Sequence, residues 1–281
     1  MADAPDASFP NPTLELRAGA SLSLGQGYNR LRLCRHGLML YNWHDQYVGR
    51  SLDLYGEFSE GEVEIFRQII RRGDVVLDVG ANIGAHTLYF ARAVGTEGRV
   101  WAFEPQRIVF QTLCANMALN SLKHVACLQV ALGEAPGKIR VLDLEPEVEQ
   151  NFGGVELEDF DYGMEVEVKR LDDLNLHRCR MMKIDVEGME LGVLKGGVET
   201  IRRLRPALYV ENDREEHSAE LIHFIAELDY ELYWHEPRLF RKPNLLNNEE
   251  NVFGGIISRN MLCLHNSAKQ VIQGLRKVER R

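Results

Sequence analysis

The sequence has no stretch near the roughly 20 uninterrupted apolar residues of a membrane span, so we expect a soluble protein. It has no C-x-x-C pair, and its five cysteines are widely spaced, so nothing suggests a zinc site or a redox couple. Free thiols fit a cytoplasmic protein. Residues 1–12 lack an apolar run and any Lys or Arg, which favours a disordered lead-in over a signal peptide.

Basic residues are also in deficit, because 33 Lys and Arg face 42 Asp and Glu for a formal net charge of -9. This balance argues against nucleic acid as a partner, since such binding depends on Lys and Arg that neutralise phosphates. Basic residues do gather near the C-terminus, interleaved with apolar residues at helical spacing. We therefore expect a docked C-terminal helix over residues 267–281, with no role at a membrane.

The 281 residues suit one large domain with additions at both ends. Short apolar runs that alternate with turn residues predict a small N-terminal β cap over residues 13–58. A main domain over residues 59–266 follows. The segment Ser59 to Glu62 resembles a capping box and predicts the start of its first helix.

Apolar runs and helical periodicity alternate through the main domain. Strands are expected at 75–79, 99–103, 125–130, 181–184 and 207–210, and helices at 85–94, 108–119 and 189–204. Runs that are apolar on both faces and separated by helices predict a parallel α/β sheet covered on both sides. Period-two segments at 138–144 and 165–169 predict a hairpin inserted between the third and fourth strands. A helix at 215–228 and strands near 230–234 and 261–264 predict an antiparallel edge.

The sharpest motif is the segment Val75 to Gly84, V-V-L-D-V-G-A-N-I-G, in which a buried strand enters a glycine turn and a helix follows. Its glycines are spaced G-x-x-x-G, unlike the G-x-G-x-x-G of dinucleotide sites. S-adenosylmethionine carries no phosphate, and its cationic groups favour a carboxylate such as Asp78. We predict that Asp78, Gly80, Asn82 and Gly84 bind this cofactor.

The next two strands end in further candidate ligands. Glu104 ends the second strand, where one carboxylate can accept hydrogen bonds from both hydroxyls of a ribose. An acid at the start of a helix before Pro105 is the simpler alternative. Ala131, after the third strand, stands where an adenine would rest, although it could equally belong to an ordinary turn.

The fourth and fifth strands deliver three carboxylates to the same edge of the sheet, Asp185, Glu187 and Glu211. We predict that they are catalytic, by holding the acceptor or taking its proton, and that Asp185 also faces the cofactor. A divalent metal between them is left open, and no metal ligand is assigned. Glu190 is interpreted as a favourable charge at a helix start.

These motifs together resemble the FkbM family of methyltransferases. The resemblance covers residues 55–265 and rests on the glycine turn, on Phe103-Glu104-Pro105, on Arg170 to Leu174 and above all on Lys183 to Glu190, K-I-D-V-E-G-M-E. It implies a class I, Rossmann-like methyltransferase fold, a mostly parallel seven-stranded sheet whose last strand is antiparallel. Members mostly methylate hydroxyls of natural products or sugars, and some act on nitrogen.

The leading hypothesis is therefore O-methylation of a small-molecule acceptor, with N-methylation as the alternative within the enzyme class. A binding module that has lost turnover and a nicotinamide oxidoreductase are weaker alternatives, and a homo-oligomer is possible. The N-terminal cap and the loop 243–260 are expected to select the substrate. Weaker site candidates are Trp43, His44, Asp45, His86 and the run Tyr233-Trp234-His235.

Overall fold

The structure, a computed structural model, describes residues 21–23, 27–154, 162–268, 272 and 274–279. Its main sheet has the order β14-β12-β13-β11-β10-β4-β5-β6. These strands are β4 (Val75–Val79), β5 (Arg99–Phe103), β6 (Val125–Leu128), β10 (Met181–Ile184), β11 (Ala207–Glu211), β12 (Tyr230–His235), β13 (Asn260–His265) and β14 (Arg276–Lys277). The chain leaves β4 toward β5 and β6 on one side and later returns to β10 on the other. The strand order therefore switches between β4 and β10, where open α/β sheets bind ligands.

The pairing within this sheet confirms the predicted class I methyltransferase fold. β6, β5, β4, β10 and β11 are mutually parallel, and β13 inserts antiparallel between β11 and β12. The two-residue strand β14 adds an eighth strand that pairs antiparallel with β12, one more than the predicted seven.

The predicted C-terminal helix over residues 267–281 is wrong for the part of this segment that the structure describes, because Arg276 and Lys277 form β14. Ile272 and Leu275 pack against the core on one face of the main sheet, whereas Val278 joins the core on the other face. The apolar residues whose spacing suggested one face of a helix are therefore divided between the two faces of the main sheet.

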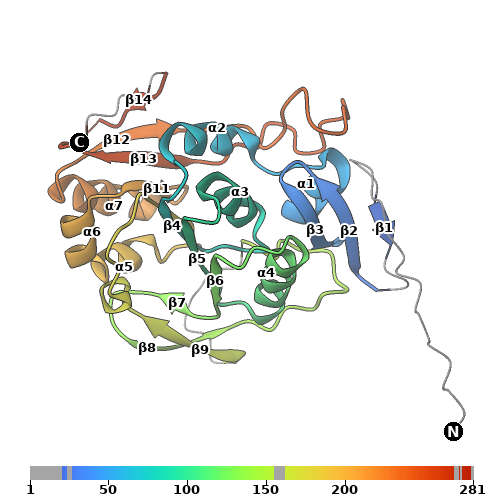
Figure 1. Cartoon of the computed structure of the whole chain (residues 1–281), viewed down its shortest axis with the longest axis horizontal. Coiled ribbons are helices and arrows are strands. Elements are labelled where there is room, and N and C mark those ends of the chain that lie inside the picture. Colours follow the sequence, from blue (N-terminus) through green and yellow to red (C-terminus); the bar gives the residue numbers. More distant parts are fainter. Residues whose placement is uncertain (1–20, 24–26, 155–161, 269–271, 273, 280–281) are drawn as a thin grey trace, which may run out of the picture.

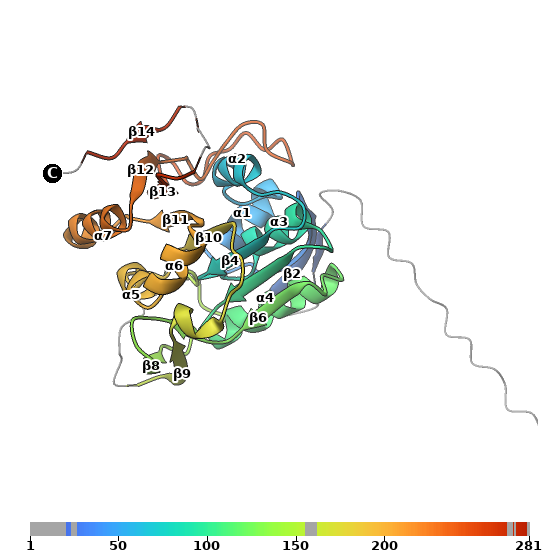
Figure 2. The same ribbon diagram turned by 60° about the vertical axis from the view of Figure 1, so that its left-hand side comes forward.

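Helices cover both faces of the sheet (Figures 1 and 2). They are α1 (Val48–Tyr55), α2 (Glu60–Ile69), α3 (Ala85–Val94), α4 (Arg107–Leu119), α5 (Glu190–Lys195), α6 (Val198–Leu204) and α7 (Glu215–Glu227), with a 3-10 turn η1 (Leu171–Leu174). Successive strand residues point to opposite cores: Leu77 and Val79 pack with α5, α6 and α7, whereas Val76 packs with α2 and α3. Strands buried on both faces explain the continuous apolar runs in the sequence.

The segment 189–204, predicted as one helix, forms two helices, α5 and α6, because the helix is interrupted at Gly196 and Gly197. A Cβ at Gly196 would lie 2.0 Å from the carbonyl oxygen of Gly133, so this close approach admits only glycine. The inserted segment forms a separate three-stranded sheet, β7 (Ala131–Leu132), β9 (Met164–Lys169) and β8 (Gly137–Val141). The predicted hairpin is its antiparallel pair β8–β9.

A second three-stranded sheet, β1 (Ser21–Ser23), β2 (Asn29–Cys34) and β3 (Gly37–Asn42), lies beside α1 and α4 (Figure 1). Two asparagines, one in α4 and one at its C-terminal cap, satisfy the open edge of β3. The backbone N–H groups of Leu38 and Leu40 donate to Asn120 and Asn116, whose side-chain amides donate back to the same two residues. These bonds fix the N-terminal sheet against the main domain.

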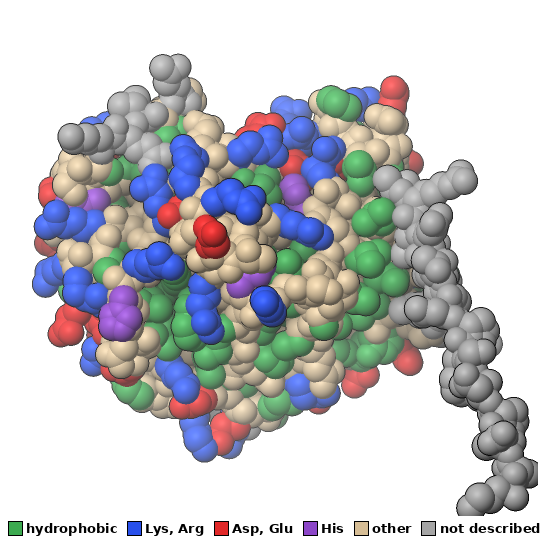
Figure 3. All heavy atoms as spheres, viewed as in Figure 1, with side chains coloured by type: hydrophobic (Ala, Val, Ile, Leu, Met, Phe, Trp, Pro, Cys, Tyr) green, Lys and Arg blue, Asp and Glu red, His purple; other side chains and the backbone are tan. Residues whose placement is uncertain are grey.

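Among the described residues, no helix is both long and apolar enough to cross a bilayer. Lys and Arg side chains are spread over the face shown in Figure 3, with Asp and Glu side chains between them and around the rim. The expectations about compartment, oligomeric state and the absence of nucleic acid remain predictions.

Candidate active site

A cavity of about 330 Å³ opens at the carboxyl ends of β4 and β10, at the point where the strand order switches. Residues from the turns after β4, β5, β10 and β11, from α2 and α3, and from the loop between β12 and β13 line it. Six of the predicted site residues meet here: Gly80, Asn82, Glu104, Asp185, Glu187 and Glu211.

The glycine turn lies directly against the end of the fourth parallel strand, β10. Gly80 has a φ of +77°, and a Cβ there would lie 1.7 Å from the carbonyl oxygen of Asp185. Both the conformation and the contact therefore require glycine at this position. The turn brings the backbone of residues 80–82 to the cavity wall.

Gly80→Ala should lower the free energy of unfolding by clearly more than Gly73→Ala. Gly73 also has a positive φ, +82°, but nothing lies within 4 Å of a Cβ placed there. The control variant thus isolates the conformational cost, about 1–2 kcal/mol, to which Gly80→Ala adds the clash with β10. Urea unfolding of both variants measures the difference. Equal losses would show that the turn does not press on β10.

Three predicted cofactor ligands do not line the cavity, and each has a structural contact instead. Asp78 is fully buried and accepts a hydrogen bond of 2.6 Å from Thr87 of α3. A Cβ at Gly84 would lie 2.7 Å from the side chain of Leu113, so Gly84 permits α3 and α4 to pack closely. Ala131 is buried in β7, paired with Val168. These residues support the segments that line the cavity without lining it themselves.

Glu104 is the buried acid of the cavity wall, with 6% of its surface exposed. One carboxylate oxygen accepts the backbone N–H of Asn82 and the other that of Gln106, both at 2.9 Å. Burial raises the pKa of Glu104 to about 7, although these two backbone bonds oppose the rise. Each oxygen has a second lone pair that can accept a ligand hydroxyl.

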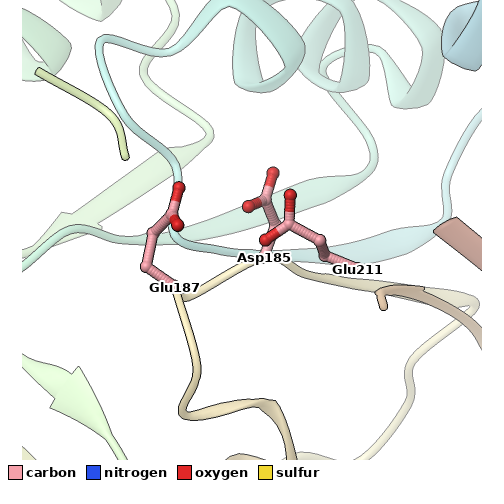
Figure 4. Close-up of side chains that lie close together, drawn as sticks. All are labelled: Asp185, Glu187 and Glu211. Atoms are coloured by element: carbon pink, nitrogen blue, oxygen red, sulfur yellow. The ribbon is translucent and has the colours of Figure 1, made fainter. Parts of the chain in front are cut away.

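Figure 4 shows Asp185, Glu187 and Glu211 converging at the end of β10 and β11, with Asp185 and Glu211 side by side. One oxygen from each carboxyl group lies within 4.8 Å of the other two, close enough to hold a metal ion. Two of the three already have cationic partners. Lys183 Nζ lies 2.7 Å from Asp185, and Arg214 Nη2 lies 3.1 Å from Glu187.

The environment separates the protonation states of these carboxyl groups. Burial raises the pKa of Glu211 well above its ordinary value, and the negative charges of Asp185 and Glu187 add to the rise. Burial and the charge of Asp185 likewise raise the pKa of Glu187 to about 7. Burial opposes ionisation of Asp185 too, but the charge and hydrogen bond of Lys183 outweigh it and hold the pKa of Asp185 below its ordinary range. Asp185 therefore ionises first, and Glu211 holds its proton more tightly than an ordinary carboxyl group.

The weaker candidates of the N-terminal segment lie next to the cavity but do not line it. His44 forms a hydrogen bond with the carbonyl oxygen of Pro146, and the ring of Trp43 packs against that of His44 at a tilt of 43°. Asp45 accepts the backbone N–H groups of Tyr47 and Gly49 and so supports the start of α1. The cavity is lined instead by Tyr47 and by Val48 of α1.

The aromatic run of β12 also lies outside the cavity wall. Tyr233 donates to Glu231, Trp234 packs under Arg259, and His235 pairs with the hydroxyl of Tyr209. His86, in contrast, does line the cavity.

Sequence reasoning missed several cavity residues. Glu62 was interpreted as part of a capping box, but Ser59 makes no side-chain cap bond and Glu62 accepts the hydroxyl of Ser258 at 2.6 Å. The segments 151–154 and 256–258 also line the cavity. One residue of the sequence could have indicated that buried acids lie in this region. Lys183 is a charged residue inside an otherwise apolar strand.

Comparison with known proteins finds methyltransferases that are similar to this chain. The family profile "Methyltransferase FkbM domain" matches residues 78–232. The chain is 32% identical to Methyltransferase 1 of Beauveria bassiana, over 43% of this chain and 57% of that protein. It is 27% identical to the 2-O-methyltransferase NoeI of Sinorhizobium fredii, over 68% of this chain and 90% of that protein.

Among solved structures, Methyltransferase FkbM from Methylobacillus flagellatus is similar with a TM-score of 0.47 and 20% identity, over 71% of this chain and 50% of that one. The match to the first curated relative thus spans little more than half of that protein's length. The family profile extends from the glycine turn to β12 and covers more than half of this chain. The protein therefore belongs to the FkbM methyltransferase domain family.

Proposed function

We propose that this protein is an S-adenosylmethionine-dependent methyltransferase that acts on a hydroxyl group of a small molecule. One observation supports this function above all others. A single cavity at the switch point of the sheet joins the glycine turn, the buried acid Glu104 and the ionised Asp185. The first two suit the cofactor, and the third suits the reacting groups.

The residues of the cavity fit the cofactor. The carboxylate of Glu104, held in place by two backbone N–H groups, is oriented to accept both ribose hydroxyls. The backbone of residues 80–82 lines the cavity, where it can contact the amino-acid part of the cofactor. When bound, S-adenosylmethionine supplies a methyl group activated by a positively charged sulfur.

Cofactor affinity should rise with pH through about 7 and be flat in Glu104→Gln, because only the ionised carboxylate accepts two hydroxyls. The pKa of Glu104 is raised, so below pH 7 the cofactor must displace a proton, and affinity should fall by up to about tenfold per pH unit. In the Gln variant the affinity at pH 8 should be lower by about 10-fold or more, the loss of at least one charge-assisted bond. Calorimetric titration of S-adenosylhomocysteine from pH 5.5 to 8.5 measures both. If the affinity of the Gln variant still changes with pH, a group other than Glu104 causes the pH dependence.

In the proposed reaction the cavity holds the acceptor hydroxyl in line with the methyl carbon, and most of the acceleration comes from this positioning. The ionised Asp185 orients the hydroxyl, and Glu211, whose pKa is raised, lies beside it. Glu187 is the third carboxyl group of this catalytic cluster. No step of this proposal requires a metal ion, since Lys183 and Arg214 already balance two of the three carboxyl groups.

The acceptor is chosen by the residues around the cavity mouth, in our proposal those of α1 and of the loop between β12 and β13. Leu239, Ile256 and Ile257 of this loop line the cavity, and the last two are 40% and 45% exposed. The name of one relative, a 2-O-methyltransferase, supports a hydroxyl acceptor, and that of another, the hexuronic acid methyltransferase AglP of Haloferax volcanii, suggests a sugar.

The experiment is incubation with methyl-labelled S-adenosylmethionine and a panel of sugars, hydroxylated natural products and amines, followed by mass spectrometry. We expect a gain of one methyl group on a hydroxyl. Methylation confined to nitrogen would favour the alternative acceptor. Cofactor binding without transfer to any member of the panel would favour a binding module.

A further inference from the structure

His86 occupies an unusual place for a histidine in the second position of α3. It lines the cavity, yet only 7% of its surface is exposed. Three aromatic rings surround it, Phe66 edge-on with centroids 5.4 Å apart, Phe58 at 5.7 Å and Phe90 at 6.2 Å. Such a cage fixes the plane of the imidazole and excludes water from its sides.

The Nε2 atom of His86 is buried and has no hydrogen-bond partner among the described residues. Its nearest charged neighbour is Oε2 of Glu62, 3.7 Å away. The other oxygen of Glu62 accepts the hydroxyl of Ser258 at 2.6 Å and the amide of Asn260 at 3.3 Å. Glu62 is therefore held by these bonds with its Oε2 atom toward the ring, as a carboxylate that selects the imidazole tautomer is held.

Burial keeps the ring of His86 in its neutral, basic form. Burial and, to a smaller extent, the Lys183 ammonium lower the pKa of His86 to about 4, although Asp78, Asp185 and Glu60 oppose this. Asp185, the other candidate base, is already bonded to Lys183 at 2.7 Å. A neutral histidine with an unshared lone pair is thus better placed to take a proton than a carboxylate that is already neutralised.

We propose that His86 is the general base of methyl transfer and that Glu62 positions its ring with the proton on Nε2. Nδ1 then takes the hydroxyl proton of the acceptor. The acceptor oxygen forms its bond to the methyl carbon, the carbon–sulfur bond breaks, and its electron pair stays on sulfur. The charge lost from sulfur reappears on the imidazolium, which Glu62 and Asp185 stabilise until the proton leaves to water. This inference rests on the proposed function.

The first test needs no substrate. Nitrogen-15 NMR of the histidine rings, with the His86 signals assigned by their loss in His86→Gln, reports the tautomer in the free protein. We expect the proton on Nε2 at neutral pH, and a shift toward the other tautomer in Glu62→Gln. A wild-type ring with its proton on Nδ1 would overturn the proposal.

The second test uses His86→Ala, which leaves an aromatic-lined space of imidazole size. Turnover on an acceptor hydroxyl should fall about 10²-fold with little change in KM, and added imidazole should restore it by about tenfold or more. His265→Ala, another buried histidine that lies outside the cavity, is the matched control. It should keep its turnover with and without imidazole. Affinity for S-adenosylhomocysteine should remain near wild type in both variants.

The outcomes separate the two proposals. Wild-type turnover in His86→Ala, or lost turnover that imidazole does not restore in a variant that still binds S-adenosylhomocysteine, refutes His86 as the base. If His86→Ala does not fold, the tautomer measurement decides. Absence of methyl transfer by the wild-type protein refutes the proposed function itself, whichever tautomer is found.

Discussion

Asp185→Asn should lower turnover on the acceptor by about 10²-fold and change S-adenosylhomocysteine affinity by less than about threefold. The substitution keeps the shape of the side chain but removes the charge that, in our proposal, orients the acceptor hydroxyl. Its partner Lys183, 2.7 Å away, stays in place. Because the carboxylate acts on the acceptor hydroxyl in our proposal, the affinity for S-adenosylhomocysteine should depend little on that charge. Steady-state kinetics and calorimetry measure the two effects separately.

A chelator distinguishes the role of Asp185 from that of a metal ligand. We expect wild-type turnover to survive EDTA, because the protein's own cations balance Asp185 and Glu187. Loss of activity in EDTA with recovery in magnesium would instead make the carboxylate cluster a cation site. Wild-type turnover of the Asn variant would show that Asp185 is structural.

Lys183→Met should destabilise the fold by about 3–5 kcal/mol at pH 8, the usual effect of breaking a buried ion pair. The ammonium is almost fully buried and lies 2.7 Å from Asp185 and 3.9 Å from Asp78. Burial already raises the pKa of Asp78, and Lys183 is the strongest opposing charge. Without it, the fully buried Asp78 carboxylate has no cation beside it.

The loss should shrink as the pH falls toward 5. The pKa of Asp78 is raised in the folded state, so the cost of ionising this buried group appears only as the pH rises through that pKa. Urea unfolding at pH 8 and pH 5 measures this difference. Lys138→Met removes an exposed ion pair with Glu165 and should leave the free energy of unfolding nearly unchanged at either pH, because solvent screens such a pair. A loss in Lys183→Met as small as in this control would contradict the buried pair.

The sheet could be predicted from the sequence because its strands are buried on both faces and their apolar runs are continuous. The strand bounds 75–79, 99–103 and 181–184 agree with β4, β5 and β10. A parallel sheet then brings the carboxyl ends of its strands together, which is why Glu104 and Asp185 could be placed in one site.

Side-chain direction could not be predicted in the same way. Asp78 and Gly80 stand two residues apart in one motif, yet Asp78 turns into the core toward Thr87, whereas Gly80 faces the cavity. Glu62 fitted a local helix-start pattern, but tertiary contacts with Ser258 and Asn260 hold its carboxylate in the cavity wall. Local motifs identify which turn forms a site, whereas the packing of distant segments decides which atoms face it.

The central claim is that this cavity binds the methyl cofactor, and thermal unfolding with S-adenosylhomocysteine or NAD tests it most directly. A ligand that binds only the native state stabilises it by about 2.7 kcal/mol at 100 times its Kd. We predict a rise in Tm with S-adenosylhomocysteine that is smaller in Glu104→Gln, and no rise with NAD. A rise with NAD and none with S-adenosylhomocysteine would contradict the account.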